Sequence, residues 1–332
     1  MSSLTGYLTK SSADLSFIFQ SGNSGLTTGY LIEDGRDIGS IFQAYTSYAA
    51  SLSGLISQSG ADISTLFEGI PSISPLSISG CCLWLDAKDT STIDLSFGKV
   101  MTWRDKSANE FVFQNSSSLN RPEYVSNSQN GLATLKFDRA SSQYLQGPSN
   151  FSIGLSSYSL FAVCNITVAN NITCSIFNKS QYGGAAGRII MIQDLSQLAI
   201  RFMHSGDVAL TTTTATYPVG NYRLLELIVN RGESTDYAYQ NGSLLTSRVI
   251  ADGVNWVDNS FNMLVGAYNN GGSGTGVQGG YFLTGNVAEI VSYKGSDMTP
   301  TNRQYIEGYL AWKWGIQTYL PSNHTYRNTI PR

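Results

Sequence analysis

The sequence predicts a mainly β protein: a jelly-roll sandwich of two antiparallel sheets with a C-terminal helix, preceded by a small repeat region of short helices and strands. Three observations support this prediction. After residue 80, many short apolar runs are bounded by clusters of Gly, Asn, Ser and Asp, as strands and turns are. Helical periodicity is nearly absent from there to Thr301. Residues 285–317 then combine an apolar strand with an aromatic-rich helix that can cover the completed sheet.

The composition is typical of a folded chain with a polar, weakly charged surface. Of the 332 residues, 42% are hydrophobic and 13% are charged, which supplies a core and disfavours solvated disorder. The net charge is −3 and the basic residues form no cluster. A nucleic-acid partner is therefore not expected, because binding to phosphates depends on a basic surface.

The first residues, MSSLTGYLTK, lack a basic stretch followed by an apolar run, so no signal peptide is expected. No segment approaches the roughly 18 apolar residues of a membrane span. We expect synthesis in the cytosol, with export by another route or release inside a virus particle left open.

A repeated motif marks residues 1–70. The pattern D-[LI]-x-x-[IL]-F occurs three times, with its Asp positions 23 and then 25 residues apart. Each Asp is suited to cap a short helix whose apolar side chains share one face. Such a unit cannot bury that face alone, so the repeats predict a docking region, with an ordinary helical subdomain as the alternative. The residues that open and close the motifs are Asp14, Phe19, Asp37, Phe42, Asp62 and Phe67.

Three further segments follow the docking region. Residues 71–80 are rich in Pro and Ser and predict a linker. The sandwich domain is expected at 81–320, and residues 321–332 form a C-terminal tail.

Local signals define the last helix of the sandwich domain. Thr299 is suited to the N-cap and Pro300 to the first helical position. Gly315 supplies the stop.

Two of the four cysteines, Cys164 and Cys174, flank a polar segment between two apolar runs. They face each other if the segment is a hairpin, and then form a disulfide. The alternative is a pair of buried free thiols on strands.

Four motifs carry a resemblance to a known family. They are LWLDA at 83–87, VMTWRDKS at 100–107, GNVAEIVSY at 285–293 and YLAWKWG at 309–315. Together they resemble the laminin-G-like branch of the concanavalin A-like lectin/glucanase superfamily, over about residues 80–320. The resemblance implies the same jelly-roll sandwich. The N-terminal repeats are similar to repeats in structural proteins of large DNA viruses and phages.

That superfamily includes glycoside hydrolases, and retaining hydrolases need two carboxylates about 5 Å apart. The arrangement E-x-D-x-x-E of the laminarinase-type enzymes is absent here. The strand that carries Glu289 has no second acid, and Asp86 and Asp89 point to opposite faces if their segment is extended. The sequence therefore predicts a protein that is not an enzyme, and it gives Glu289 a backbone or Lys/Arg partner at the sandwich edge.

A calcium site is one possible binding function, since many laminin-G-like domains hold Ca²⁺ at a loop rim. Asp105, Asn109 and Asp138 lie in suitable turns. The alternative is that these residues only form the turns themselves.

A sugar site is the second possibility, and it needs exposed aromatic rings beside amides. Tyr268, Asn269 and Asn270 are the first candidates and Trp256 the second. The other tryptophans lie in strand and helix motifs and are expected in the core.

The first function that we predict is a non-enzymatic structural protein, a minor capsid or virion-surface component of a large DNA virus. Its repeats dock to other capsid proteins, and its lectin-like jelly roll is displayed on the virion. A homo-oligomer is compatible with this role. The alternative is a carbohydrate-binding module for a host or cell-wall glycan, and a glycoside hydrolase comes third.

Overall fold

The computed structural model of the chain describes residues 74–154, 156–167, 173–179, 190–194, 199–205, 208–212, 220–249, 261–269, 277, 281–295 and 298–331. Residues Ile73–Arg332 form one compact unit. The three repeats lie outside the described residues, as does the predicted docking region. Within the described part the chain is mostly strand, with one α-helix near its end, as predicted.

The strands and helices have the following bounds, in chain order: η3 (Pro75–Ser77), β1 (Cys81–Asp86), η4 (Thr90–Thr92), β2 (Ile93–Ser96), β3 (Lys99–Arg104), β4 (Val112–Gln114), η5 (Ser118–Asn120), β5 (Glu123–Gln129), β6 (Leu132–Phe137), β7 (Leu145–Gln146), β8 (Ser157–Ile166), β9 (Thr173–Asn178), β10 (Ile190–Asp194), β11 (Ala199–Ser205), β12 (Val208–Thr212), β13 (Arg223–Asn230), β14 (Thr235–Gln240), β15 (Ser243–Val249), β16 (Leu264–Val265), β17 (Gly285–Gly295), α2 (Pro300–Lys313) and η6 (Gln317–Tyr319).

The first sheet is organised around β17, the last strand of the sequence. β17 pairs with β8 along one side and with β6 and then β1 along the other. From β8 the sheet continues through β13 and β14 to β15, and from β6 it continues to β5. All of these pairs are antiparallel.

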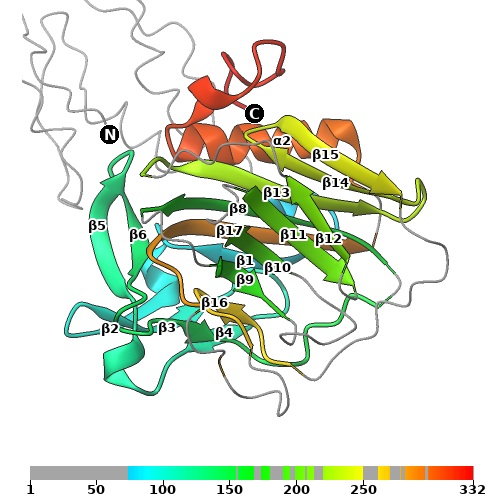
Figure 1. Cartoon of the computed structure of the whole chain (residues 1–332). Helices are drawn as coiled ribbons and strands as arrows, with labels where there is room; N and C mark the ends of the chain where they lie inside the picture. The colour runs from blue at the N-terminus through cyan, green and yellow to red at the C-terminus, as the bar shows by residue number, and fades with distance from the viewer. Residues whose placement is uncertain are drawn as a thin grey trace, which may run out of the picture. The chain divides into compact units, whose positions relative to one another are not determined.

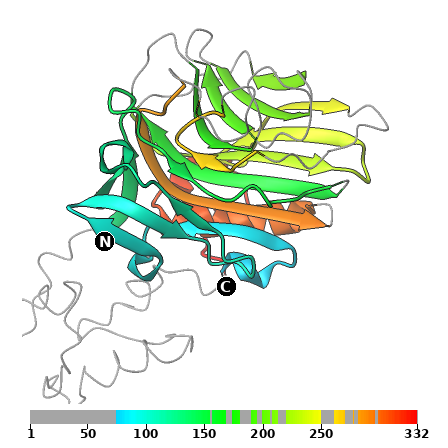
Figure 2. The ribbon, with the colours of Figure 1, turned by 90° about the horizontal axis from the view of Figure 1, so that it is seen from below.

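The second sheet follows the order β2, β3, β4, β7, β16, β9, β10, β11 and β12. A single backbone pair, Lys99 with Glu123, joins β3 to β5 of the first sheet. Figures 1 and 2 show the two sheets as layers, with α2 on the far side of the first sheet. This is the two-sheet antiparallel sandwich that the sequence predicted.

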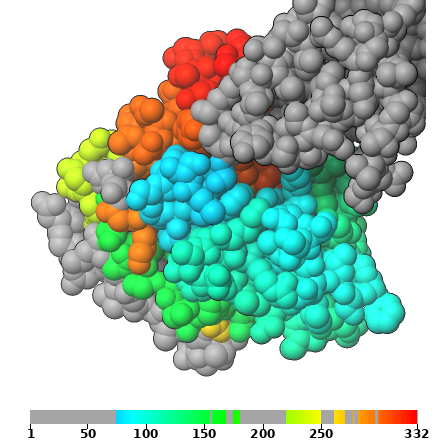
Figure 3. All heavy atoms as spheres, turned by 180° about the vertical axis from the view of Figure 1, so that it is seen from behind, coloured from blue at the N-terminus to red at the C-terminus, as the bar shows by residue number. Residues whose placement is uncertain are grey.

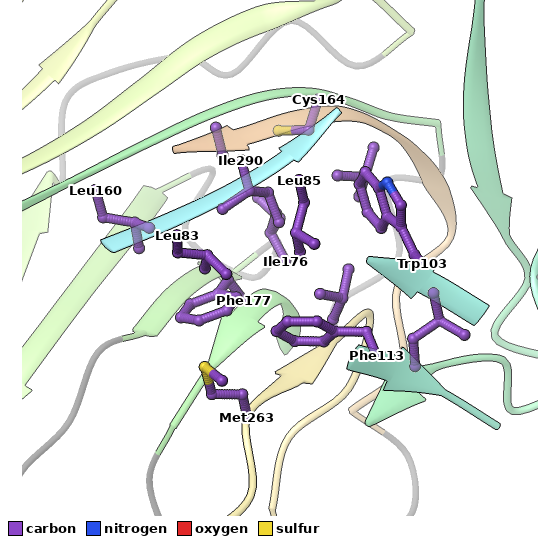
Figure 4. Packing of buried hydrophobic residues seen from close by; sticks show 14 of the residues in the cluster. Leu83, Leu85, Trp103, Phe113, Leu160, Cys164, Ile176, Phe177, Met263 and Ile290 are labelled. Carbon is purple, nitrogen blue, oxygen red and sulfur yellow. The ribbon is translucent and has the colours of Figure 1, made fainter. Parts of the chain in front are cut away.

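The main core lies between the sheets. Along β8, Leu160, Ala162 and Cys164 alternate onto the inner face, where they join Phe113 of β4 and Phe177 of β9. Figure 4 shows these side chains converging from several strands. At about 25 cal/mol per Å² of apolar area, burial of this cluster is the main stabilising term of the sandwich.

A second apolar layer lies on the other face of the first sheet. Phe161 and Val163 of β8 point away from the second sheet and pack with Ile306 and Leu310 of α2 and with Trp314, which follows the helix. β8 is therefore buried on both faces, which explains the continuous apolar run LFAVC at its centre.

The signals that predicted α2 are confirmed. The Thr299 side chain accepts a hydrogen bond from the backbone N–H of Asn302 at 3.2 Å, and Pro300 is the first helical residue. The helix ends before Gly315, which has a φ of +68°. In the described ranges, no helix has the length and apolar character that crossing a membrane requires.

Of the two possibilities left open for Cys164 and Cys174, the structure does not show the hairpin. Cys164 belongs to β8 in the first sheet and Cys174 to β9 in the second, and each strand pairs with other neighbours. Both are free thiols buried in the core, which was the alternative.

The segment after Leu320 packs against α2, and Figure 3 shows it beside the helix. The indole N–H of Trp312 donates to the carbonyl oxygen of Tyr326 at 2.7 Å. Gly308 leaves room for this contact, since a Cβ there would lie 2.5 Å from Cβ of Tyr326.

Candidate functional site

Glu289 has more partners than the sequence predicted. Its carboxylate accepts hydrogen bonds from the indole N–H groups of Trp84 at 2.7 Å and Trp314 at 2.6 Å. Tyr309 donates at 3.1 Å, and the ammonium of Lys313 lies 2.7 Å away. Lys313 does provide the expected basic partner, but in the middle of the helix–sheet interface, where Glu289 is fully buried.

A second acid lies beside Glu289, and it comes from another strand. Asp86 of β1 is the backbone partner of Glu289 across the β1–β17 pair, and its carboxylate lies 2.8 Å from the same Lys313 ammonium. Lys106 lies 3.2 Å from Asp86 and 2.7 Å from Asp89. The expectation of opposite faces for the two aspartates does not apply, because the chain turns after β1 instead of staying extended.

A β-bulge orients Glu289 toward α2. Val287 pairs with Cys164 and Glu289 pairs with the next residue of β8, Val163, so Ala288 is the extra residue. Val287 faces the core between the sheets, whereas Ala288 faces the helix layer. Glu289, opposite Val163, consequently also faces the helix.

The burial and contacts of Asp86 and Glu289 indicate that the pair has a structural role. Both carboxylates are buried, with 3% and 0% of the residue exposed, and α2 covers them. Burial, the largest influence, raises the pKa of Glu289 even though Lys313 opposes the shift. The two oxygen atoms of Glu289 already accept three hydrogen bonds and pair with one ammonium group, so a substrate cannot approach them.

A second buried acid cluster joins β13, α2 and the C-terminal segment. Burial and the charge of Glu307 raise the pKa of Glu226, whose Oε1 accepts a hydrogen bond from the N–H of Gly242 at 2.8 Å. Despite burial, His324, Glu226 and Arg303 hold the pKa of Glu307 below its usual value. His324 bonds to Glu307 through Nε2 at 2.8 Å, and its Nδ1 accepts from the N–H of Tyr326 at 3.0 Å. The Nε2–H tautomer follows, and the cluster fastens the C-terminal segment to α2.

The residues suggested for calcium bond to groups of their own turns and, for Asp105 and Asn109, also to the backbone of β1. Asp105 accepts from the N–H groups of Trp84 at 2.7 Å and Ser107 at 2.8 Å, and from the Ser107 hydroxyl at 2.7 Å. Asn109 donates to the carbonyl of Cys82, and Asp138 accepts from its own turn.

Among the residues that the structure describes, no three His, Cys, Asp or Glu side chains gather as a metal-ligand set. Asp138 also follows β6, in a different turn from Asp105 and Asn109. The observed contacts correspond to the alternative given above, turn formation.

The residues suggested for a sugar site do not meet its requirement for exposure. Tyr268 is 3% exposed and its ring packs 6.0 Å from that of Tyr281. Asn269 is 1% exposed and donates to Asn178 Oδ1 at 2.8 Å. The turn folds inward to satisfy these amides, while Asn270 and Trp256 lie outside the described residues.

A different feature offers a binding surface: a groove of about 390 Å³ on the second sheet. Its lining is polar and uncharged. The lining residues are Val112, Gln114, Asn115, Ser116, Tyr144, Gln146, Gly147, Pro148 and Asn262.

The strands β4 and β7 place two amides at the centre of this groove. Gln114 and Gln146 are direct partners across the β4–β7 pair. Their neighbours Phe113 and Leu145 are fully buried in the core, so by alternation both glutamines face outward. Neither glutamine side chain has a hydrogen-bond partner among the described residues, and Gln114 is exposed.

The walls and floor of the groove are held by the protein itself. Asn115 donates to the carbonyl of Tyr144 at 3.0 Å and accepts from the N–H of Ser117, which fixes one wall. Arg121 donates to the carbonyl of Asn115 at 2.7 Å. In the floor, a Cβ at Gly147 would lie 2.7 Å from the ring of Phe113, so glycine allows the chain to pass over that ring.

Sequence reasoning missed this groove. β4 has three residues and β7 has two, which is too short for an alternating pattern to be recognised. The only local signal was the order Val-Phe-Gln at 112–114, in which one buried ring separates two outward side chains.

Fold and groove together define a β-sandwich protein with a preformed, uncharged polar groove on one sheet. No family model matches the chain, and no curated protein sequence matches it.

Several solved structures are similar in fold over part of the chain. The binding domain of Paraclostridial Mosquitocidal Protein 1 is 11% identical, with a TM-score of 0.48 over 72% of this chain and 52% of its own. Trypanosoma rangeli sialidase in complex with sialic acid is 14% identical, with a TM-score of 0.49 over 73% of this chain and 35% of its own. Domain 4 of AbnA, a GH43 extracellular arabinanase from Geobacillus stearothermophilus, in complex with arabinotriose, is 13% identical, with a TM-score of 0.43 over 67% and 96%. This chain thus spans about half of the first and about a third of the second, and likenesses this distant assign it no activity.

Proposed function

We propose that the chain is a non-enzymatic carbohydrate-binding protein and that the groove over β4 and β7 is its binding site. The observation that carries this proposal is the pair of outward amides, Gln114 and Gln146, fixed side by side on neighbouring strands. Each amide offers two N–H donors and one carbonyl acceptor. The hydroxyl groups of a sugar ring need donors and acceptors of this kind.

The remaining lining suits the other surface of a sugar, its apolar C–H face. Val112 is 41% exposed, and the ring of Tyr144 is half-buried. The Tyr144 ring is held by contact with Phe282, at a centroid distance of 6.3 Å. A volume of about 390 Å³ falls within the range of small-ligand pockets, which starts at about 300 Å³.

Binding without cleavage is supported by the positions of the acids. Among the residues that the structure describes, those lining the groove include no Asp, Glu, His or Cys. Asp86 and Glu289, the acid pair described above, are covered by α2 on the other side of the first sheet. Glycoside hydrolysis needs two carboxyl groups on either side of the scissile bond.

The role as a minor capsid or virion-surface protein stays a prediction, together with its capsid partners and its location in the virion. It depended on the repeats that open at Asp14, Asp37 and Asp62, which lie outside the described residues. Glycan binding, the alternative given by the sequence, has the better support because the groove belongs to the described part.

The proposal is tested by applying the full-length chain to an array of oligosaccharides and measuring the strongest binder by calorimetry. We expect Gln114→Ala and Gln146→Ala each to weaken binding about three- to tenfold, the value of one or two net hydrogen bonds. Asn323→Ala is the matched control, since Asn323 is an exposed amide on the segment beside α2. Absence of binding to every glycan, or equal binding by all three variants, contradicts the proposal.

A further inference from the structure

We infer that the ligand of the groove is an uncharged glycan, bound without a metal ion. This inference rests on the function proposed above and adds the chemical class of the sugar. It excludes sialylated, sulfated and uronic-acid glycans as ligands, and it excludes recognition through calcium.

The first argument is the charge of the lining. All nine lining residues that the structure describes are neutral, and their polar atoms are amides, hydroxyls and backbone groups. A carboxylate or sulfate that entered the groove would lose part of its hydration without meeting a cation, and such an unpaired charge is costly. An uncharged sugar loses only hydroxyl hydration, which Gln114, Gln146 and Ser116 can replace.

The second argument is the state of the nearest cation with contacts to the lining. Arg121 donates from Nε to the carbonyl of Asn115 at 2.7 Å and from an Nη to the carbonyl of Ser116 at 3.0 Å. These bonds engage the guanidinium in bracing the wall. Arg121 itself is not among the described residues that line the groove.

The third argument concerns metal ions. Calcium in proteins takes six to eight oxygen ligands, usually with carboxylates among them. The described part of the lining offers no carboxylate, and the side chain of Asn115 is already engaged with the carbonyl of Tyr144 and the N–H of Ser117. Recognition is thus left to the two glutamines and the apolar surfaces of Val112 and Tyr144.

The experiment compares matched neutral and acidic oligosaccharides on the full-length chain: lactose with sialyllactose, and neutral gluco- and arabino-oligosaccharides with their uronic or sulfated counterparts. We expect binding of neutral members only. Affinity should change by less than about twofold between 0.1 M and 1 M salt, although the Debye length falls from about 10 Å to about 3 Å. A metal chelator should leave the affinity unchanged.

The outcomes separate this inference from the proposed function. Binding of acidic glycans that Gln114→Ala weakens would keep the groove as a glycan site but overturn the neutral class. Loss of neutral-glycan binding after addition of a chelator would overturn only the inference that the glycan binds without a metal ion. No binding of either class by the native chain would remove the proposed function and this inference together. Neutral binding that Gln114→Ala and Gln146→Ala weaken and Asn323→Ala leaves intact supports both.

Discussion

Glu289 shows how one buried charge is accommodated in this protein. Two indole N–H groups, a tyrosine hydroxyl and the Lys313 ammonium surround its carboxylate, and all lie within 3.1 Å. Lys313 also neutralises Asp86. A buried pair of this kind adds little net stability over apolar packing, but removal of one partner leaves the other charge without compensation.

We predict that Glu289→Gln lowers the free energy of unfolding by about 3 kcal/mol, because Lys313 then stays buried with a weaker set of partners. The measurement is urea denaturation followed by tryptophan fluorescence. Glu123→Gln is the control: its partner Lys136 lies 3.2 Å away with both side chains about half exposed, so a loss below about 1 kcal/mol is expected. Equal losses for the two variants would show that Glu289 is not held as described.

At the scale of elements, α2 is fixed to the first sheet at both ends. Near its start, Arg303 and Glu307 reach Glu226 of β13 and His324 of the C-terminal segment. Near its end, Lys313 reaches the acids of β1 and β17. The residues between these polar groups are apolar and complete the second layer. Polar contacts therefore set the position of the helix, while apolar burial supplies most of the free energy.

At Gly308 the C-terminal segment approaches α2 closely. A Cβ at this position would lie 2.5 Å from Cβ of Tyr326 and 2.8 Å from Cγ of Pro331. Replacement of a helical glycine by alanine normally gains up to about 1 kcal/mol. Here the clash makes the substitution destabilising instead, since overpacking costs about 1–3 kcal/mol.

We therefore predict that Gly308→Ala destabilises the protein by about 1–2 kcal/mol and loosens the C-terminal segment. Amide hydrogen exchange at residues 321–331 should rise together with the loss of unfolding free energy. Thr301→Ala, at an exposed position of the same helix, is the control. A Gly308→Ala protein that is more stable than the native chain would contradict the predicted contact.

At the scale of the whole molecule, α2, the first sheet and the second sheet form three layers with different roles. The central strands β8 and β17 of the first sheet are buried on both faces, and the sheet carries the acids that hold α2. The second sheet is covered on one face and presents the groove on the other. Figure 1 shows α2 and the strands β4 and β16 on different sides of the sandwich. Several buried acids of the first sheet have pKa values above their usual range, which makes the stability of the whole molecule depend on pH.

Asp236 of β14 gives this pH dependence its clearest test. Burial raises its pKa to about 7, although Arg248 and Arg231 oppose the shift. The native state then holds a proton that the unfolded chain releases near pH 4, so the free energy of unfolding falls as pH rises from about 4 to 7. The contribution is at most about 1.4 kcal/mol per pH unit.

We predict that Asp236→Asn flattens the pH dependence in this window. The measurement is the difference in unfolding free energy between the native chain and the variant at several pH values from 4 to 8. The unfolding free energy of the native chain should fall relative to that of the variant as pH rises. The difference should stop changing above about pH 7, once Asp236 is ionised. Parallel profiles would show that Asp236 titrates at its ordinary value.

Local sequence signals were sufficient to predict the features that depend on contacts within a few residues. The cap at Thr299, the proline at the helix start and the stop at Gly315 act within a few residues of themselves. Alternating and continuous apolar runs gave the sandwich, because burial on one or both faces leaves that pattern in the sequence. For the candidate site, the sequence did not indicate the groove, and its own candidates for sugar contact, Tyr268 and Asn269, are buried.

The remaining features depend on register between distant segments. Asp86 and Glu289 are 203 positions apart, and they meet only because β1 pairs with β17 and a bulge at Ala288 turns Glu289 toward α2. Gln114 and Gln146 form a site only because β4 and β7 are neighbours in the second sheet. By itself, then, the sequence determined the fold class, the closing helix and the absence of a linear acid motif. Tertiary structure decided which acids meet and which amides stay free, since strand pairing brings together side chains whose spacing along the chain carries no signal.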